Sequence, residues 1–337
     1  MVVTEICMGT MTFGEQADQA MSHRILDRAY EKGVDFYDLA EMYPVPPSAE
    51  KFGVTETIFG QWLKDKPRDS VILATKITGP GHGWFRPPVR HGMTAIDAHQ
   101  IRRALDASLK RLGTDFIDLY QIHWPDHGLP YEDLLGALAE EKQKGKIRAI
   151  GCSNETCWGV MKCLWTADKF RLPRFDTVQN NFSLINRRCD SELAQVCRRE
   201  QVSLLPYSPL GGGVLTGKYN SGGQFPDGAR FTWYLEKGQE RQKLMARRFV
   251  NDRTLAVAAR VSEIAREAGL HPATLAVAWS KQHDYVASTI IGVSHIDQLD
   301  DCLKAGDITL SDDVMRKLEA LEVEIPNSMT EDGLRRL

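Results

Sequence analysis

The sequence has no long apolar run and no strong excess of charge of either sign. No stretch approaches the ~20 apolar residues that a membrane-spanning helix needs, and the N-terminal MVVTEICMGTMTFG has no basic region followed by an apolar core. The 42 Lys and Arg residues nearly balance the 45 Asp and Glu residues, which leaves a formal net charge of −3. Because nucleic acids and anionic membranes attract concentrated Lys and Arg, these absences argue against both partners and predict a cytoplasmic protein.

Cysteine pairs at metal-binding spacing are also absent. The chain has seven cysteines, an odd number, and none of them forms a C-x-x-C pair. Such a set is typical of a reducing compartment, where thiols pack as small hydrophobic groups. We therefore expect no disulfide framework, no zinc site and no other metal.

Two glycine-rich nucleotide motifs are missing or incomplete. No G-x-G-x-x-G follows the first apolar run, which removes the main support for a Rossmann fold. The segment GGVLTGK, residues 212–218, matches G-x-x-x-x-G-K, but Tyr219 follows where a P-loop needs Ser or Thr to hold magnesium. An ATPase is therefore disfavoured.

Eight short apolar runs alternate with amphipathic segments along the whole chain. The helical pattern is clearest at residues 18–32, where Asp18 can cap the start and Gly33 can end the helix, and at residues 97–112, which Gly113 follows. Eight strand-helix units predict an α/β fold that closes into a (β/α)₈ TIM barrel. The runs are TEICMGT, VDFYDLA, SVILATK, FIDLYQIHW, IRAIGCS, FDTVQNN, VSLLPYS and VASTIIG.

The chain is longer than a minimal barrel, and the excess lies in three segments. Residues 79–93 and 219–251 follow the third and seventh strands, so we expect long loops at the C-terminal face, where barrel active sites lie. The tail after residue 306 contains an added helix near residues 311–322. Because no linker or repeat interrupts the chain, one domain over residues 1–337 is the simplest prediction.

Polar side chains close three of the predicted strands. Asp38, Lys76 and His123 each end an apolar run, and Tyr43 follows Asp38 by five residues. Buried charges must be paired, so we expect an ion pair between Lys76 and Asp38 that lowers the pKa of Tyr43 and lets it donate a proton. His123 would hydrogen-bond the same substrate oxygen. Each residue alone also has a structural explanation: a snorkelling lysine, a satisfied histidine or a turn-capping aspartate.

Several motifs in consecutive order give the sequence a family resemblance. It resembles the aldo-keto reductase superfamily, and in particular its Tas-like branch, which carries AEMYPVPP and SNET. That resemblance implies reduction of an aldehyde or ketone with NADPH, with Tyr43 as general acid, Lys76 and Asp38 as its tuning pair, and His123 orienting the carbonyl. The motifs are DLAEMY, GVTETIFGQWL, ATK, SLKRLGTDFIDLYQIH, GKIRAIGCSN and QNNFSL.

The resemblance also implies contacts to the nicotinamide end of the cofactor. Its amide would be held by Ser153, Asn154 and Gln179, and its ring would stack on Tyr207. These residues follow the fifth, sixth and seventh predicted strands, at the same mouth as the polar residues above.

The phosphates and adenosine would contact later segments. Lys218 and Arg230 would clamp the phosphates, although Arg230 alone is also explained as a solvated loop charge. A helix opening after the last strand would offer its N-terminus to an anion. The further cofactor contacts implied are Thr10, Met11, Ser208, Leu210, Gly212, Gly292, Ser294, Gln298 and Asp301.

The sequence departs from the family pattern at several positions. No Arg lies between Gly292 and Cys302 to grip a 2′-phosphate, so NADH remains an alternative to NADPH. Pro44 stands where a Gly usually follows the catalytic Tyr, and we expect a stiff, ordered wall there. The N-terminal hairpin of many relatives is expected to be absent or short.

The substrate is expected to be a small carbonyl compound. Trp84 and Trp124 are candidates for an aromatic wall around it, although Trp84 is equally suited to packing its own loop. The oligomeric state stays open, with a homo-oligomer among the alternatives.

Two other functions remain. One is an NADPH-binding regulatory subunit with slow turnover, as in potassium-channel β subunits, which resemble this family. The other is a lyase that forms a Schiff base on Lys76, which pairing with Asp38 disfavours because a paired ammonium is a poor nucleophile.

Overall fold

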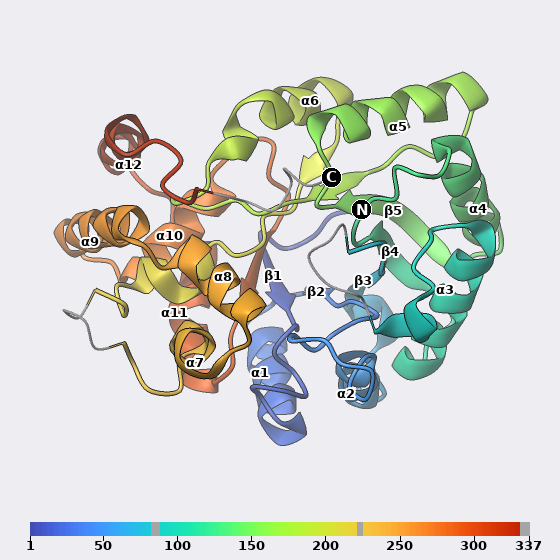
Figure 1. Ribbon diagram of the computed structural model, residues 1–337, viewed down its shortest axis with the longest axis horizontal. Helices are drawn as coiled ribbons and strands as arrows, with labels where there is room; N and C mark the ends of the chain where they lie inside the picture. Colours follow the sequence, from blue (N-terminus) through green and yellow to red (C-terminus); the bar gives the residue numbers. More distant parts are fainter. Residues whose placement is uncertain (82–87, 221–224, 331–337) are drawn as a thin grey trace.

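Each of the eight apolar runs contains a β-strand, and the strands lie parallel in one sheet. The computed structural model describes residues 1–81, 88–220 and 225–330. The strand order is β7-β6-β5-β4-β3-β2-β1-β8, so β8 returns to β1, and helices surround the strands (Figure 1). This arrangement confirms the predicted (β/α)₈ barrel. The strands are β1 (Ile6–Gly9), β2 (Phe36–Asp38), β3 (Ile72–Ile77), β4 (Ile117–Ile122), β5 (Ile147–Ser153), β6 (Thr177–Gln179), β7 (Ser203–Leu204) and β8 (Thr289–Gly292).

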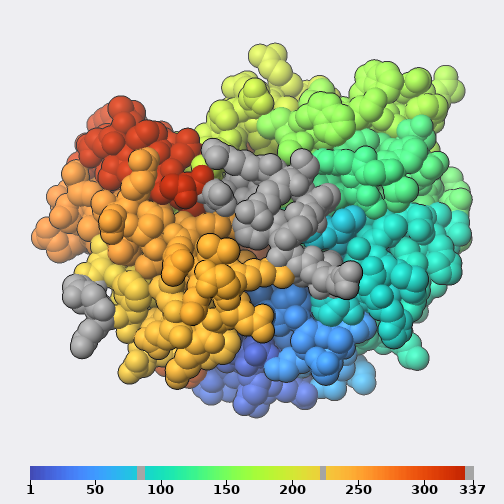
Figure 2. All heavy atoms as spheres, in the orientation of Figure 1, coloured from blue at the N-terminus to red at the C-terminus, as the bar shows by residue number. Residues whose placement is uncertain are grey.

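The helices include the added C-terminal one, and two of them lie in the segment that the sequence suggested was a loop. Residues 219–251 contain α7 and α8, which form part of the surface seen in Figure 2. The helices are α1 (Gln19–Glu31), α2 (Val54–Leu63), α3 (Ala98–Leu112), α4 (Tyr131–Gln143), α5 (Cys157–Phe170), α6 (Glu192–Glu200), α7 (Arg230–Lys237), α8 (Glu240–Phe249), α9 (Asp252–Glu267), α10 (Pro272–Lys281), α11 (Leu299–Leu303) and α12 (Asp312–Glu324). Within the described ranges, no helix combines the length and apolar character needed to cross a membrane.

The cap predicted at Asp18 and the stop predicted at Gly113 are present, and Asp97 adds a cap at the start of α3. The Asp18 carboxylate accepts a hydrogen bond from Met21 N (2.8 Å), and Asp97 accepts one from Gln100 N (2.8 Å). At the other end of α3, Gly113 has a φ of 67°, a left-handed conformation that glycine adopts without strain. Local sequence chemistry therefore sets where these helices begin and end.

The interior of the barrel is filled by one residue from most of the strands. Cys7, Phe36, Ala74, Leu119 and Ile290 form a buried apolar cluster with Leu205. Successive side chains of a strand point to opposite faces, so the residue two positions further along also points inward. This second inward layer, nearer the C-terminal ends of the strands, is where the polar residues lie.

The barrel closes between β7 and β8 through isolated bridges. The three backbone hydrogen bonds there are Leu204 N to Tyr285 O (2.8 Å), Ala287 N to Leu204 O (3.1 Å) and Ile290 N to Pro206 O (2.8 Å). β7 is short because Pro206 has no N–H to continue a ladder. We call the contact of residues 204–206 with residues 285–290 the β7–β8 seam.

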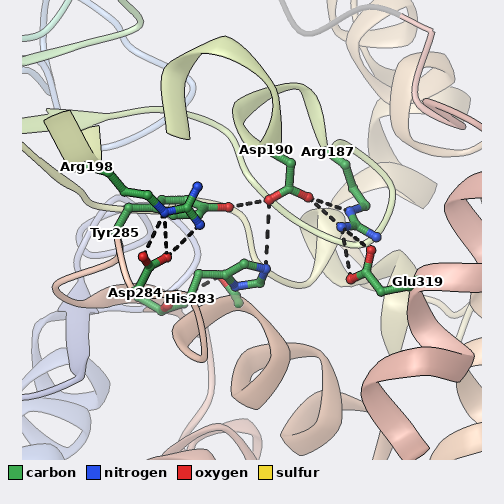
Figure 3. Close-up of polar contacts among 9 residues, drawn as sticks. Arg187, Asp190, Arg198, His283, Asp284, Tyr285 and Glu319 are labelled. Carbon is green, nitrogen blue, oxygen red and sulfur yellow. Dashed lines mark hydrogen bonds and ion pairs between the residues drawn. The ribbon is translucent and has the colours of Figure 1, made fainter. Parts of the chain in front are cut away.

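The C-terminal helix α12 is fastened to the segment that follows β6. Arg187 lies between two carboxylates, with its guanidinium 2.6 Å from Asp190 Oδ2 and 2.8 Å from Glu319 Oε2 (Figure 3). Tyr285 donates a hydrogen bond to the other oxygen of Asp190. Arg187 thus ties α12 to the chain that leads out of the barrel mouth.

Candidate active site

Three strand ends bring an ion pair and a histidine together at the barrel mouth. Lys76 Nζ lies 2.6 Å from Asp38 Oδ2 and donates a second hydrogen bond to Leu39 O (2.7 Å). Lys76 is 0%, Asp38 2% and His123 6% exposed. A buried pair of this kind needs close geometry and further hydrogen bonds to be tolerated, and both are present.

Tyr43 lies directly over this pair. Lys76 Nζ is 5.1 Å from the centre of the Tyr43 ring. The Tyr43 and His123 rings are 5.6 Å apart and nearly perpendicular, with an angle of 85°. The four residues that the sequence singled out for proton transfer are therefore neighbours, although they come from three different strand ends.

The electrostatics of Tyr43 differ from the sequence-based expectation. Burial raises the pKa of Tyr43 above its usual value; Lys76 acts in the opposite direction, and Asp38 adds to the rise. Lys76 does act to lower the pKa of Tyr43, as expected, but removal from water disfavours the phenolate more than Lys76 stabilises it, so the net shift is upward. The hydroxyl keeps its proton at neutral pH.

Lys76 and His123 hold fixed charge states. Burial favours the neutral amine of Lys76, but Asp38 and Tyr43 together outweigh it, so the pKa of Lys76 is raised. Burial, assisted by Lys76, holds the pKa of His123 well below its usual value. His123 is therefore a neutral imidazole, and its buried Nδ1 has no hydrogen-bond partner among the described residues.

A pair of glutamines meets the remaining oxygen of Asp38. Gln179 Nε2 donates to Asp38 Oδ1 (2.9 Å), and Gln121 Nε2 donates to the same oxygen (3.2 Å). Gln179 Nε2 also donates to Gln121 Oε1 (3.2 Å). Sequence reasoning missed Gln121, although its position two residues before His123 on β4 was the signal that it points inward.

The residues proposed to hold the nicotinamide amide lie in one connected group. Ser153 Oγ donates to the backbone oxygen of Gln179 (2.8 Å). Asn154, with a left-handed φ of 54°, donates to His123 O (2.9 Å) and accepts from the Tyr207 hydroxyl (2.7 Å). The structure thus links these residues to His123 through Asn154 and to Asp38 through Gln179.

Two cations face a turn of consecutive glycines after β7. A Cβ atom at Gly212 would come within 2.7 Å of the Arg230 guanidinium, and one at Gly213 within 2.8 Å of Lys218 Nζ. Burial lowers the pKa of Lys218, Arg230 lowers it further, and burial lowers the pKa of Arg230. Within residues 1–81, 88–220 and 225–330, neither forms an ion pair. Two partly buried, mutually repelling cations beside bare backbone suit a polyanion.

Four more of the expected cofactor residues lie either at the glycine turn or beside Asp38 and Tyr43. Ser208 has a left-handed φ of 57°, and its backbone oxygen accepts from Gly211 N (2.8 Å) at the start of the glycine turn. Leu210 caps that turn. Thr10 donates twice to the backbone oxygen of Asp38, and Met11 packs against the cluster that contains Tyr43.

The segment after β8 differs in detail from the expectation. The helix expected to open at Gly292 and Ser294 begins as a 3-10 turn at Ile296–Gln298 before α11. Ser294 N donates to Gln298 Oε1 (3.0 Å). The Asp301 carboxylate lies 2.9 Å from Lys304 Nζ and 3.6 Å from His271 Nδ1.

The substrate side is only partly defined. Trp124 is half-buried, and its ring stacks beside His123 at 6.1 Å between centroids. Trp84 lies outside the described residues. The wall expected after Tyr43 is tied down by Val45 N, which donates to Met11 O (3.0 Å).

A buried ion pair that the sequence did not reveal supports this wall. Glu41 Oε2 is 2.5 Å from Arg90 Nη1 and accepts from Thr78 N (3.0 Å). Arg90 also donates to Thr78 O (2.7 Å). In the part of the chain that the structure describes, no group of three or more His, Cys, Asp or Glu side chains is arranged to hold a metal ion.

Comparison with known proteins gives matches over nearly the whole chain. A model of the aldo/keto reductase family matches residues 5–323. "Protein tas" of Escherichia coli K12 is 44% identical, with 95% of this chain and 94% of that protein covered. "Uncharacterized oxidoreductase YrpG" of Bacillus subtilis is 32% identical over 94% and 91%. "Norsolorinic acid reductase stcV" of Emericella nidulans is 28% identical over 94% and 78%.

Proposed function

This chain belongs to the aldo/keto reductase family, and we propose that it is an NADPH-dependent reductase that converts aldehydes or ketones to alcohols. As a member of that family it is an oxidoreductase that acts on small carbonyl compounds with a nicotinamide nucleotide. The observation that carries the proposal is the buried Lys76–Asp38 pair at 2.6 Å with the Tyr43 ring directly over it.

Tyr43 is the general acid in this proposal. Its raised pKa keeps the hydroxyl protonated at neutral pH, so a proton is available for the carbonyl oxygen. The Lys76 ammonium stabilises the phenolate that forms when the proton leaves. Asp38 keeps Lys76 charged in a site from which water is excluded.

His123 orients the carbonyl as a neutral hydrogen-bond donor. An imidazolium beside Lys76 would place two positive charges in one buried site, and the lowered pKa of His123 avoids that. A neutral imidazole still has one N–H to donate to the carbonyl oxygen. Donation to that oxygen strengthens as negative charge develops on it.

The cofactor is held at two places. Ser153, Asn154 and Gln179 bind the carboxamide at the mouth, while Lys218 and Arg230 bind the phosphates. The two cations without a carboxylate partner among the described residues, beside a glycine turn, support the fit. Bound NADPH supplies the hydride that reduces the carbonyl carbon.

The remaining assignments follow the same pattern. Tyr207 would support the nicotinamide ring, and Trp124, whose ring lies beside His123, would form one wall of the carbonyl pocket. Thr10, Met11, Ser208, Leu210, Gly212, Gly292, Ser294, Gln298 and Asp301 line the rest of the cofactor.

The test is consumption of NADPH, and separately of NADH, with a panel of aromatic and aliphatic aldehydes and ketones. We expect the wild type to consume NADPH faster than NADH and Tyr43→Phe to lose about 10²–10⁴-fold in rate. Fluorescence titration should give the same NADPH affinity for both proteins, because only a hydroxyl is removed. Binding of NADPH without turnover by the wild type would contradict the proposal and favour a regulatory subunit.

A further inference from the structure

The polar residues in the barrel mouth form one inward-facing layer. Phe36, Ala74 and Leu119 fill the barrel interior on β2, β3 and β4. Two residues further along these strands lie Asp38, Lys76 and Gln121, which therefore share the same inward face. Proton transfer as proposed uses the first two and leaves Gln121 without a role.

Asp38 determines how the neighbouring amides are oriented. An ionised carboxylate only accepts hydrogen bonds, so Gln121 and Gln179 must both turn their NH₂ groups toward Asp38 Oδ1. Gln179 uses its second N–H on Gln121 Oε1 (3.2 Å). Because both N–H groups are occupied, Gln179 has only its carboxamide oxygen left to offer a ligand, and a ligand NH₂ is the partner that this oxygen fits.

Gln121 holds the carboxamide of Gln179 in one orientation. It is 0% exposed, and it both donates to Asp38 and accepts from Gln179. On the neighbouring strand Gly151 packs beside it: a Cβ atom there would be in ordinary contact with Gln121 Cγ at 3.4 Å, and the clash, at 2.2 Å, would be with Thr177 Oγ1. The carboxamide of Gln121 is thus held from both ends.

We infer that Gln121 is a positioning residue: it fixes Gln179 with its oxygen toward the carboxamide of the nicotinamide ring, and joins that anchor to the Asp38–Lys76 pair below Tyr43. The inference rests on the proposed function. In this inference the buried amide of Gln121 aligns the nicotinamide ring, which donates the hydride, with Tyr43, which donates the proton.

The experiment compares two ligands that differ only in the nicotinamide half. NADPH carries the carboxamide, whereas 2′-phospho-ADP-ribose keeps the phosphates and adenosine but lacks the nicotinamide ring. We expect Gln121→Met, which keeps the length of the side chain and removes both hydrogen bonds, to weaken NADPH about tenfold. Binding of 2′-phospho-ADP-ribose should change less than twofold, and kcat for carbonyl reduction should fall at least tenfold.

A matched control separates positioning from general loss of packing. Gln100 on α3 is also a buried glutamine, 6% exposed, and lies outside the site. Gln100→Met should leave both affinities and kcat at the wild-type values. Equal weakening of the two ligands by Gln121→Met, or no weakening of either, would overturn the inference.

A second variant keeps the test decisive if Gln121→Met folds poorly. Gln121→Glu preserves shape and, when the introduced carboxyl is protonated, restores both the donor to Asp38 and the acceptor for Gln179. A carboxyl beside Asp38 has a raised pKa, so NADPH affinity should recover toward wild type between pH 8 and about pH 5.5. If the NADPH affinity of Gln121→Glu relative to that of the wild type does not change with pH, the inference is contradicted. Failure of the wild type to bind NADPH or reduce any carbonyl would instead overturn the proposed function.

Discussion

His123 is the residue whose charge state most constrains the chemistry. Its ring is buried against Tyr43 and Trp124, and Lys76 is the nearby cation that opposes a second positive charge. Its pKa in the folded protein therefore lies well below the value of 6.5 that it has in an unfolded chain. In the proposed reaction His123 would therefore act as a neutral hydrogen-bond donor throughout the physiological pH range.

The same shift makes His123 a source of acid instability. Below pH 6.5 the unfolded chain takes up a proton that the folded protein does not, so the free energy of unfolding falls as the pH drops. We expect His123→Gln to lessen this fall by about 1 kcal/mol per pH unit below 6.5. Urea unfolding at pH 7.5, 6.5 and 5.5 measures the free energy of unfolding of both proteins. If it falls equally with pH in the variant and the wild type, the prediction is contradicted.

His127 offers a control of opposite sign. It hydrogen-bonds the buried Glu155 (3.2 Å), and that contact raises its pKa above 6.5. Its contribution to stability is therefore complete below pH 6.5 and is lost as the pH rises through its folded pKa. His127→Gln should accordingly lower stability most at acid pH.

At the scale of elements, one buried ion pair joins the exits of β2 and β3. Glu41 lies two residues before Tyr43, and Arg90 belongs to the segment that follows β3. Their side chains are 2% and 4% exposed, and Thr78 hydrogen-bonds to both. The position of Tyr43 above Lys76 thus depends on a contact made far along the chain.

Removal of Arg90 should be strongly destabilising. Arg90→Met leaves the Glu41 carboxylate buried without its partner, and we expect the free energy of unfolding to fall by about 3–5 kcal/mol. The exposed pair of Arg28 and Asp300, at 37% and 50% exposure, is the comparison, since Arg28→Gln removes a solvent-screened ion pair and should leave the free energy of unfolding nearly unchanged. Denaturant unfolding of both variants measures the two losses in free energy of unfolding. Equal losses would contradict the stabilising role given to the buried Glu41–Arg90 pair.

The sequence predicted elements and strand ends because these depend on local pattern. Asp18 and Asp97 cap helices through neighbouring amides, and short apolar runs that alternate with helical patterns favour the strands of a parallel sheet. The Glu41–Arg90 contact was not predictable in this way, because it joins residues 49 positions apart that only the folded loops bring together. The direction of the Tyr43 pKa was missed for a related reason, since burial depth is a property of the whole fold.

Gln121 was within reach of sequence reasoning. Attention to the last polar residue of each strand found Asp38, Lys76 and His123. Counting back two positions from His123 reaches Gln121, which the alternation of a strand places on the same inward face. Its partners on β2 and β6 still required coordinates, because strand neighbours do not fix which amide meets which carboxylate.

At the scale of the whole molecule, closure of the barrel is uneven. β3 and β4 pair over continuous ladders, whereas the β7–β8 seam rests on isolated bridges with three backbone hydrogen bonds. The glycine turn with Lys218 leaves from one side of the seam, and the segment with Ser294 leaves from the other. A ligand that contacts both segments spans the seam.

Amide hydrogen exchange should show whether a bound ligand stabilises the β7–β8 seam. We expect the amides of Leu204, Ala287 and Ile290 to exchange faster than those of β3 and β4 in the free protein, because local opening is easiest where pairing is sparse. NADPH at 100 times its Kd should slow them about 100-fold. The amides of β4 serve as the internal control, and uniform slowing of both regions would contradict seam-specific opening.

The seam also bears on how long a molecule survives in the cell. Proteases cut chains where they open, and in this barrel the opening lies under the segments proposed to grip the coenzyme. If the seam opens as predicted, a copy that holds its nucleotide would be protected, whereas an empty copy would be degraded first. The abundance of the protein would then follow the supply of reduced nucleotide, without any dedicated sensor.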